Sequence, residues 1–193
     1  SQYDSAIQYY RAHVDYENGN LNEAVKSFAQ LEKDPVYANV APYYIAHILY
    51  LQGNYTEAIR YAEPLAKKGS DAKTQGMTRI VADSHFSLGE YAKAESQYKT
   101  LFQSIGNNQA LRADYYHMGM SQYKNGHYAD AITNLSKCTK EKDNIAQNAY
   151  YHLADSYLHT GDKTKARNAF ESASNLSFDR AIQEDSHFNR LKL

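Results

Sequence analysis

Five glycines divide the sequence at nearly regular intervals, and this regularity constrains the fold more than any other feature of the chain. Successive members of the set are 34, 36, 37 and 35 residues apart. Each lies seven residues after a small residue and five residues before an alanine. The five are Gly19, Gly53, Gly89, Gly126 and Gly161. A period of this length, with two helical patterns in each unit, predicts a solenoid of helix pairs.

Residues 43–65, with the sequence YYIAHILYLQGNYTEAIRYAEPL, show the repeating unit most clearly. One apolar helical pattern ends at Gly53-Asn54 and a second one begins directly after it. This arrangement predicts a helical hairpin. Small residues on either side of the turn, such as Ala46 and Ala58, would let the two backbones approach closely. The sequence therefore predicts an all-α fold.

The period predicts one continuous array without a domain boundary. Five repeats span residues 5–38, 39–72, 75–108, 112–145 and 147–180, and a terminal helix spans residues 181–193. Gly76 falls inside the first helix of the third repeat, where glycine is a poor helix former. The terminal helix has no second helix after it, so we interpret it as the first helix of a truncated sixth repeat. Ile182, Phe188 and Leu191 would be exposed on it, and we expect self-association through this helix.

The balance of charges argues against nucleic-acid and lipid partners. The chain has 21 basic and 22 acidic residues, and a formal net charge of −1 provides no field to attract nucleic acid or anionic lipid. Its apolar runs are shorter than the ~18 residues that a membrane-spanning helix needs. The single cysteine, Cys138, excludes an internal disulfide, and its place late in a second helix is typical of a small buried hydrophobe. We expect neither a nucleic-acid partner nor direct insertion into a membrane.

The sequence lacks the patterns of the common catalytic and metal sites. Eight histidines are present, but there is no HExxH and no Cys/His cluster, and His152 and His159 lie seven residues apart, two helical turns. Patterns of the GxSxG, phosphate-loop and dinucleotide-loop types are also missing. No constellation supplies a nucleophile, a base and an oxyanion donor together. We therefore predict that the protein is not an enzyme and uses no metal and no cofactor.

The repeated unit resembles the tetratricopeptide repeat (TPR) family, whose unit is about 34 residues long. The matching residues in the second repeat are Ile45-Ala46, Gly53-Asn54-Tyr55 and Ala58-Ile59, and in the fifth repeat they are Leu153-Ala154, Tyr157, Gly161-Asp162, Ala166 and Phe170. The family tryptophan is absent, and Tyr115 and Tyr150 stand in its place in two repeats. The resemblance implies a right-handed α-solenoid of five TPR helix-turn-helix repeats plus the terminal helix.

Two longer stretches carry a narrower resemblance. AIQYYRAHVDYENGNLNEAVKSFAQLEKDP and QNAYYHLADSYLHTGDKTKARNAFESASNLSFD are similar to the middle segments of large multi-TPR proteins of bacterial cell envelopes. This similarity implies that the chain is a segment of a longer protein. It also implies a location in the cell envelope or periplasm, while a cytoplasmic location stays open.

The TPR resemblance implies a concave groove lined by the first helix of each repeat. The family's groove positions fall on residues spaced i, i+4 and i+7, which share one helical face. The predicted binding residues are Tyr9, His13, Tyr16, Tyr43, His47, Tyr50, Arg79, Phe86, Tyr116, Tyr123 and Tyr151. Arg79 is the one cation among these positions that could meet a carboxylate, and Asp83, one turn away, could neutralise it.

Two hypotheses of function follow. In the first, the chain is a non-enzymatic protein-interaction module or scaffold that presents an aromatic groove to a peptide segment or helix of an unidentified partner protein. In the second, it is a structural spacer of a larger multi-repeat protein and has no groove ligand. A binding module needs several exposed rings in the groove, whereas a spacer would bury them between neighbouring helices.

Overall fold

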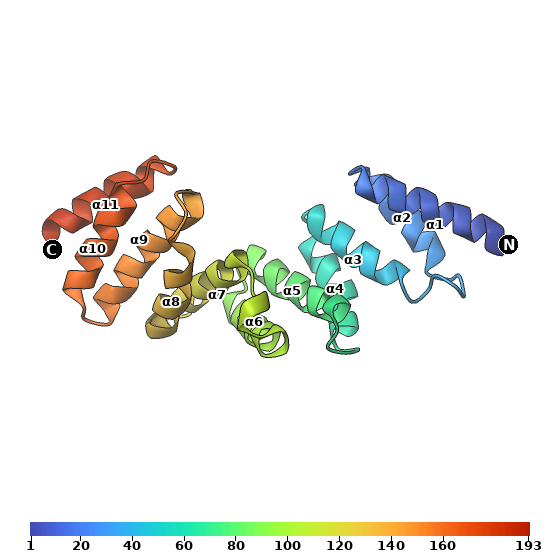
Figure 1. Cartoon of the computed structure of the whole chain (residues 1–193), viewed down its shortest axis with the longest axis horizontal. Coiled ribbons are helices and arrows are strands. Elements are labelled where there is room, and N and C mark those ends of the chain that lie inside the picture. Colours follow the sequence, from blue (N-terminus) through green and yellow to red (C-terminus); the bar gives the residue numbers. More distant parts are fainter. The chain divides into compact units, whose positions relative to one another are not determined.

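The computed structural model describes residues 1–193, apart from the side chain of Asn107, and Figure 1 shows that it is built of helices. Over these described residues it contains eleven α-helices, two short 3₁₀ helices and no strand. Among the described helices, none is both long and apolar enough to cross a membrane. The predicted fold class, an all-α solenoid of helical repeats, is confirmed.

The chain separates into two compact units, and the first spans residues 1–104. Its helices are α1 (Gln2–Glu17), α2 (Leu21–Leu31), α3 (Ala41–Leu51), α4 (Tyr55–Ala66), α5 (Ala72–Ser87) and α6 (Tyr91–Ile105), the last ending one residue into the second unit. Sequence neighbours pack against each other, α1 on α2, α3 on α4 and α4 on α5, and α3 also contacts α5. The first helices of successive repeats therefore lie side by side within this unit.

The second unit spans residues 105–193. It contains η1 (Asn107–Gln109), α7 (Arg112–Lys124), α8 (Tyr128–Leu135), η2 (Ser136–Cys138), α9 (Asn144–His159), α10 (Lys163–Ser174) and α11 (Arg180–Lys192). Here α7 packs on α8, α9 on α10, and α10 on α11, so the hairpin pattern continues (Figure 1). The five repeat ranges and their arrangement in one array stay predictions.

The five periodic glycines all make the turns that the sequence predicts. Their φ angles lie between 75° and 86°, in the left-handed region that only glycine adopts without strain. At the second turn, Gly53 donates its N–H to the Tyr50 carbonyl at 3.0 Å, and Asn54 donates to the Leu49 carbonyl at 2.9 Å. This pair of bonds satisfies carbonyls that the end of α3 would otherwise leave unpaired.

Small residues hold the two helices of each hairpin close together, as predicted. Ala46 and Ala58, on either side of the second turn, are both completely buried. Gly119 takes the same place in α7, and a Cβ added there would lie 2.7 Å from Leu135 Cγ. A larger side chain at these positions would push the two helices apart.

Cys138 is a buried residue, in agreement with the sequence-based interpretation. It lies in η2, directly after α8, at the repeat position that Leu31 and Leu101 fill in other repeats, and all three are buried. Burial raises the pKa of its thiol to about 11, so the thiolate is scarce at neutral pH. The side chain is a packing group of the second unit.

Arg112 joins α7 to the start of α9. Its guanidinium donates to both carboxylate oxygens of Asp143, at 2.6 and 2.9 Å, and to the Cys138 carbonyl at 2.7 Å. Asp143 also caps α9 by accepting from the Ala146 N–H at 2.9 Å. The guanidinium and this cap hold the pKa of Asp143 at about 2.

The predicted terminal helix is α11, and it exposes apolar side chains. Phe188 and Leu191 are 57% and 68% exposed, as expected, whereas Ile182 is half-buried. Lys192 places its ammonium 4.3 Å from the centre of the Phe188 ring. The outer side of α11 therefore presents two large apolar residues to solvent.

Candidate binding groove

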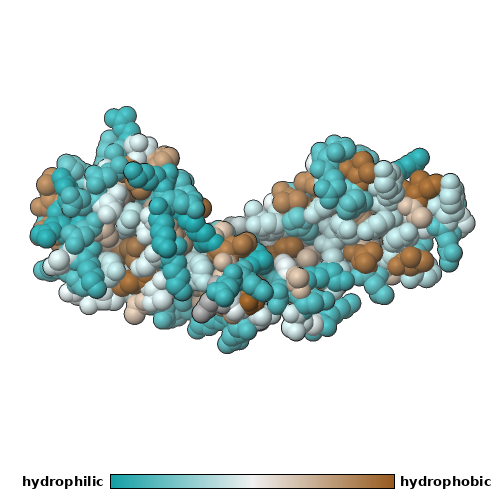
Figure 2. Space-filling model, in the orientation of Figure 1, coloured by the Kyte–Doolittle hydropathy of each residue, from teal (hydrophilic) through white to brown (hydrophobic). Residues whose placement is uncertain are grey.

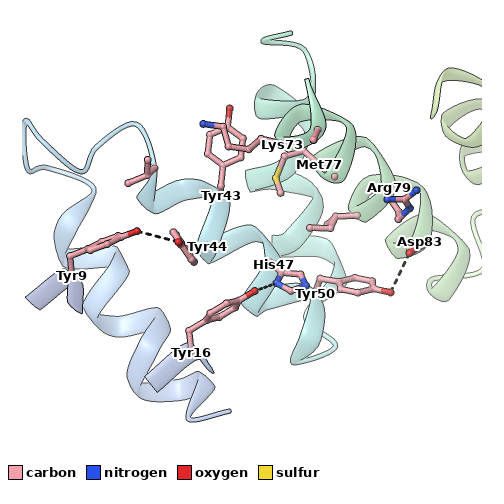
Figure 3. A pocket seen from close by; sticks show the side chains of 14 residues that line it. Tyr9, Tyr16, Tyr43, Tyr44, His47, Tyr50, Lys73, Met77, Arg79 and Asp83 are labelled. Atoms are coloured by element: carbon pink, nitrogen blue, oxygen red, sulfur yellow. Dashed lines mark hydrogen bonds between the residues drawn. The ribbon is translucent and has the colours of Figure 1, made fainter. Parts of the chain in front are cut away.

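The first helices of three successive repeats, α1, α3 and α5, line a groove of about 510 Å³ in the first unit (Figure 3). Six of the predicted binding residues lie in its wall. They are Tyr9, Tyr16, Tyr43, His47, Tyr50 and Arg79. On the face of this unit that Figure 2 shows, pale residues of intermediate hydropathy surround separate brown hydrophobic ones. Five tyrosines and His47 contribute aromatic rings with polar tips to the wall of the groove.

Three tyrosine hydroxyls bond across neighbouring first helices (Figure 3). Tyr16 Oη lies 2.5 Å from His47 Nδ1, and Tyr9 Oη lies 3.1 Å from Tyr44 Oη. Tyr50 donates to Asp83 Oδ2 at 3.3 Å. These hydrogen bonds occupy the hydroxyl tips of Tyr9, Tyr16 and Tyr50.

Ring stacking fixes Tyr9 and Tyr44 in the wall. Tyr9 stacks on Tyr37 with a centroid distance of 4.7 Å, and Tyr44 stacks on the buried Phe28 at 4.4 Å. Both tyrosines are half-buried. These two rings pack between helices in the way that the spacer hypothesis expects, and they also form one side of the groove.

Burial shifts the pKa values of three groove tyrosines and of His47 in the direction that favours the uncharged side chain. Burial raises the pKa values of Tyr44 and Tyr50 to about 12, with further contributions from Tyr9 and from Asp83 respectively. Burial also raises the pKa of Tyr16 and lowers that of His47. A neutral His47 that accepts the Tyr16 hydroxyl at Nδ1 carries its proton on Nε2, where it can serve as a donor.

One cation is held at an aromatic ring of the groove. Lys73, at the start of α5, is exposed and places its ammonium 4.4 Å from the centre of the Tyr43 ring. A distance of this size gives a favourable cation–π contact. Within the described side chains, Lys73 forms no salt bridge with a carboxylate. Its charge also helps to lower the pKa of Asp71, two residues earlier in the chain.

Five predicted residues lie outside the lining of this groove. His13 is on α1 with its Nε2 3.6 Å from Glu17 Oε1, and Phe86 is on α5 with its ring against Tyr91. The other three, Tyr116, Tyr123 and Tyr151, belong to the second unit. Tyr123 donates to Asp155 Oδ2 at 2.6 Å, Tyr151 donates to Asp185, and burial raises the pKa of Tyr116.

Sequence reasoning missed several residues of the groove. Tyr44, Lys73, Gly76 and Met77 line it but were not among the predicted binding residues. Tyr44 lies three residues before His47 and shares its helical face, a spacing that could have included it. Gly76 also left a signal in the sequence, since a glycine inside a predicted helix needs a reason. Nothing in the local pattern marked Lys73 or Met77.

Comparison with known proteins bears on the fold and the family. The tetratricopeptide repeat family model matches residues 9–73, 43–107 and 116–182. YrrB, a TPR protein described as having an unusual peptide-binding site, superimposes with a TM-score of 0.71 at 14% identity over 93% of this chain and 90% of its own. A crystal structure of MamA gives a TM-score of 0.76 at 13% identity, over 91% of this chain and 93% of its own. The search of curated protein sequences returned no match.

Proposed function

Because the chain belongs to the tetratricopeptide repeat family, whose members are generally protein-interaction modules, we propose that it is a non-enzymatic scaffold. It binds a peptide segment of a partner protein in the groove formed by α1, α3 and α5. The observation that carries this proposal is the groove itself. Its volume of about 510 Å³ is within the range of ~300–1,000 Å³ that ligand pockets occupy.

The chemistry of the wall supports a peptide ligand. Rigid aromatic rings with few rotatable bonds provide contact area at a low entropic cost, and tyrosine is enriched where proteins bind segments of other proteins. The Nε2–H of His47 and the ammonium of Lys73 are polar groups that could orient a backbone carbonyl or a carboxylate. The peptide-binding site described for YrrB, a protein of the same fold, is in keeping with this function.

A structural spacer is the second candidate function, and one observation favours it. Tyr16, Tyr50 and Tyr123 each use their hydroxyl to bond to the next repeat. Tyr16 and Tyr50 in the groove, and Tyr123 in the second unit, thereby join successive repeats, which is what a spacer requires of them. The two functions differ in the role of the ring faces, because a spacer needs the hydroxyl bonds and the packing but no ligand on the rings.

A selection from a random library of phage-displayed peptides tests the proposed function. Enriched peptides are synthesised and their affinity is measured by fluorescence anisotropy for the wild-type chain and three variants. Tyr50→Ala removes ring and hydroxyl, Tyr50→Phe removes the hydroxyl alone, and Tyr10→Ala removes an exposed tyrosine of α1 that does not line the groove. Circular dichroism first confirms that all variants are helical.

The expected pattern separates the two candidates. Loss of a buried aromatic anchor costs about 2 kcal/mol of binding free energy, or ~30-fold in affinity, so Tyr50→Ala should bind weakly. Tyr50→Phe and Tyr10→Ala should bind as the wild type does. If no peptide is enriched, or if Tyr50→Ala binds as well as Tyr10→Ala, the groove is not a peptide site and the spacer is the better account.

A further inference from the structure

Gly76 lies inside α5, and the fold of this chain gives no reason for a glycine there. Glycine in the interior of a helix makes the helix less stable than alanine at the same position does. Its φ is not in the left-handed region, and a Cβ built on it would meet no atom within 4 Å. The other glycine inside a helix, Gly119, is different, because its Cβ would collide with Leu135 at 2.7 Å. Only Gly119 is explained by the packing of the chain itself.

The empty space beside Gly76 opens into the groove. Gly76 lines it together with Ala72, one helical turn earlier, so two small residues leave this part of the α5 backbone uncovered. Tyr43 and Met77 line the same groove, and Lys73 extends to the Tyr43 ring. Figure 3 shows Lys73, Tyr43 and Met77 gathered at one end of the cavity. A ligand could approach the helix backbone closely at this point.

The cation at this end of the groove is Lys73. Lys73 is ten residues before Asp83, which places them ~15 Å apart along the axis of α5. The Asp83 carboxylate accepts hydrogen bonds from Tyr50 and Tyr98 at the far end. The nearest acidic residue in sequence, Asp71, caps α5 through the Thr74 N–H and hydroxyl. Lys73 forms no salt bridge within the described side chains, but its charge helps to lower the pKa of Asp71, so a ligand carboxylate would share the ammonium with Asp71.

We propose that the subsite formed by Tyr43, Lys73 and Gly76 binds an acidic residue and a neighbouring large apolar residue of an extended partner peptide. This inference rests on the proposed function and names the peptide class. The carboxylate pairs with the Lys73 ammonium, which the Tyr43 ring already orients. The apolar side chain lies over Gly76, between Met77 and the ring of Tyr43. Because Gly76 has no side chain, the space beside it can hold this apolar residue of the partner.

The peptide selection also tests this subsite when it is repeated on Lys73→Glu and on Lys26→Glu. Lys26 is an exposed lysine of α2 outside the groove, so its variant carries the same charge reversal and serves as the matched control. Peptides selected on the wild type and on Lys26→Glu should be enriched in Asp or Glu next to Leu, Ile, Phe or Met. Selection on Lys73→Glu should lose the acidic preference. Gly76→Leu fills the space with a side chain. This variant should remain helical, and its affinity for the peptides selected on the wild type should be at least ~10-fold lower.

The possible failures are distinguishable. If the selected peptides show no acidic preference, or if Lys73→Glu and Gly76→Leu bind them as the wild type does, the subsite is wrong. The proposed function then still stands, provided that Tyr50→Ala lowers the affinity. If Tyr50→Ala also leaves the affinity unchanged, both the subsite and the peptide groove are refuted.

Discussion

Tyr50 of the second repeat donates a hydrogen bond of 3.3 Å to Asp83 of the third, and Tyr98 donates to the other oxygen of the same carboxylate. An equivalent contact joins Tyr16 to His47 at 2.5 Å, and in the second unit Tyr123 to Asp155 at 2.6 Å. We call these three contacts the tyrosine bridges. In each, a tyrosine of one first helix bonds to a residue of the next first helix, 31 to 33 positions further on.

Removing one bridge should lower stability without changing the groove surface. Tyr50→Phe takes away the hydroxyl, and a typical hydrogen bond contributes about 0.5–1.5 kcal/mol to the free energy of unfolding. Asp83 keeps its bond from Tyr98, so we expect a loss of about 1 kcal/mol in urea denaturation. Tyr10→Phe, at a 69% exposed position, is the control and should have no effect. Equal midpoints for the two variants would show that the bridge adds nothing.

The two glycines inside helices should respond to alanine in opposite ways. Gly76→Ala should raise the free energy of unfolding by about 1 kcal/mol, because alanine is the better helix former and its Cβ has no neighbour within 4 Å. Gly119→Ala should lower it by about 1–3 kcal/mol, since its Cβ would lie 2.7 Å from Leu135 Cγ. Chemical denaturation followed by circular dichroism measures both. A destabilised Gly76→Ala would mean that the α5 glycine has a packing role after all.

The Arg112–Asp143 ion pair should make stability depend on acid pH. The pKa of Asp143 is about 2 in the folded chain and is ordinarily near 3.8, so the pair stabilises the fold above pH ~4. This contribution falls as the pH drops and is lost near pH ~2. Asp143→Asn, which can still cap α9, should therefore be less stable than the wild type at pH 7. The difference between the two should shrink toward pH ~2.

Denaturation midpoints at a series of pH values measure this dependence. Glu63→Gln removes an exposed carboxylate of α4 and is the control. Its difference from the wild type should stay small at every pH. A difference between Asp143→Asn and the wild type that does not change from pH 7 to pH ~2 would rule out a role for the ion pair.

The exposed apolar side of α11 should promote self-association. Phe188 and Leu191 offer two large side chains to a second copy of the chain, and burying such residues is favourable. We expect the weight-average mass in analytical ultracentrifugation to rise with concentration. Replacing both residues by Ser should abolish the rise, and replacing the exposed Leu51 of α3 by Ser should not. A constant monomer mass for the wild type would contradict this prediction.

Local features of the sequence were sufficient to predict the helices and turns. The periodic glycines reveal the turns because each needs a positive φ, and the alanines at fixed distances from them reveal where two helices touch. Six of the residues at the groove positions implied by the TPR resemblance line a common cavity, and their role in binding stays a prediction. These features depend on short-range geometry, which a helical period specifies.

Only the tertiary structure decided how the side chains on the helices are used. The sequence could not tell that Tyr44 stacks on Phe28, that Tyr50 bonds to Asp83, or that Gly76 faces open space while Gly119 meets Leu135. The three contacts join residues at least 16 positions apart in the chain, and Gly76 has no such neighbour. A helical period fixes the direction in which a side chain points, but the packing of neighbouring repeats fixes what it meets there.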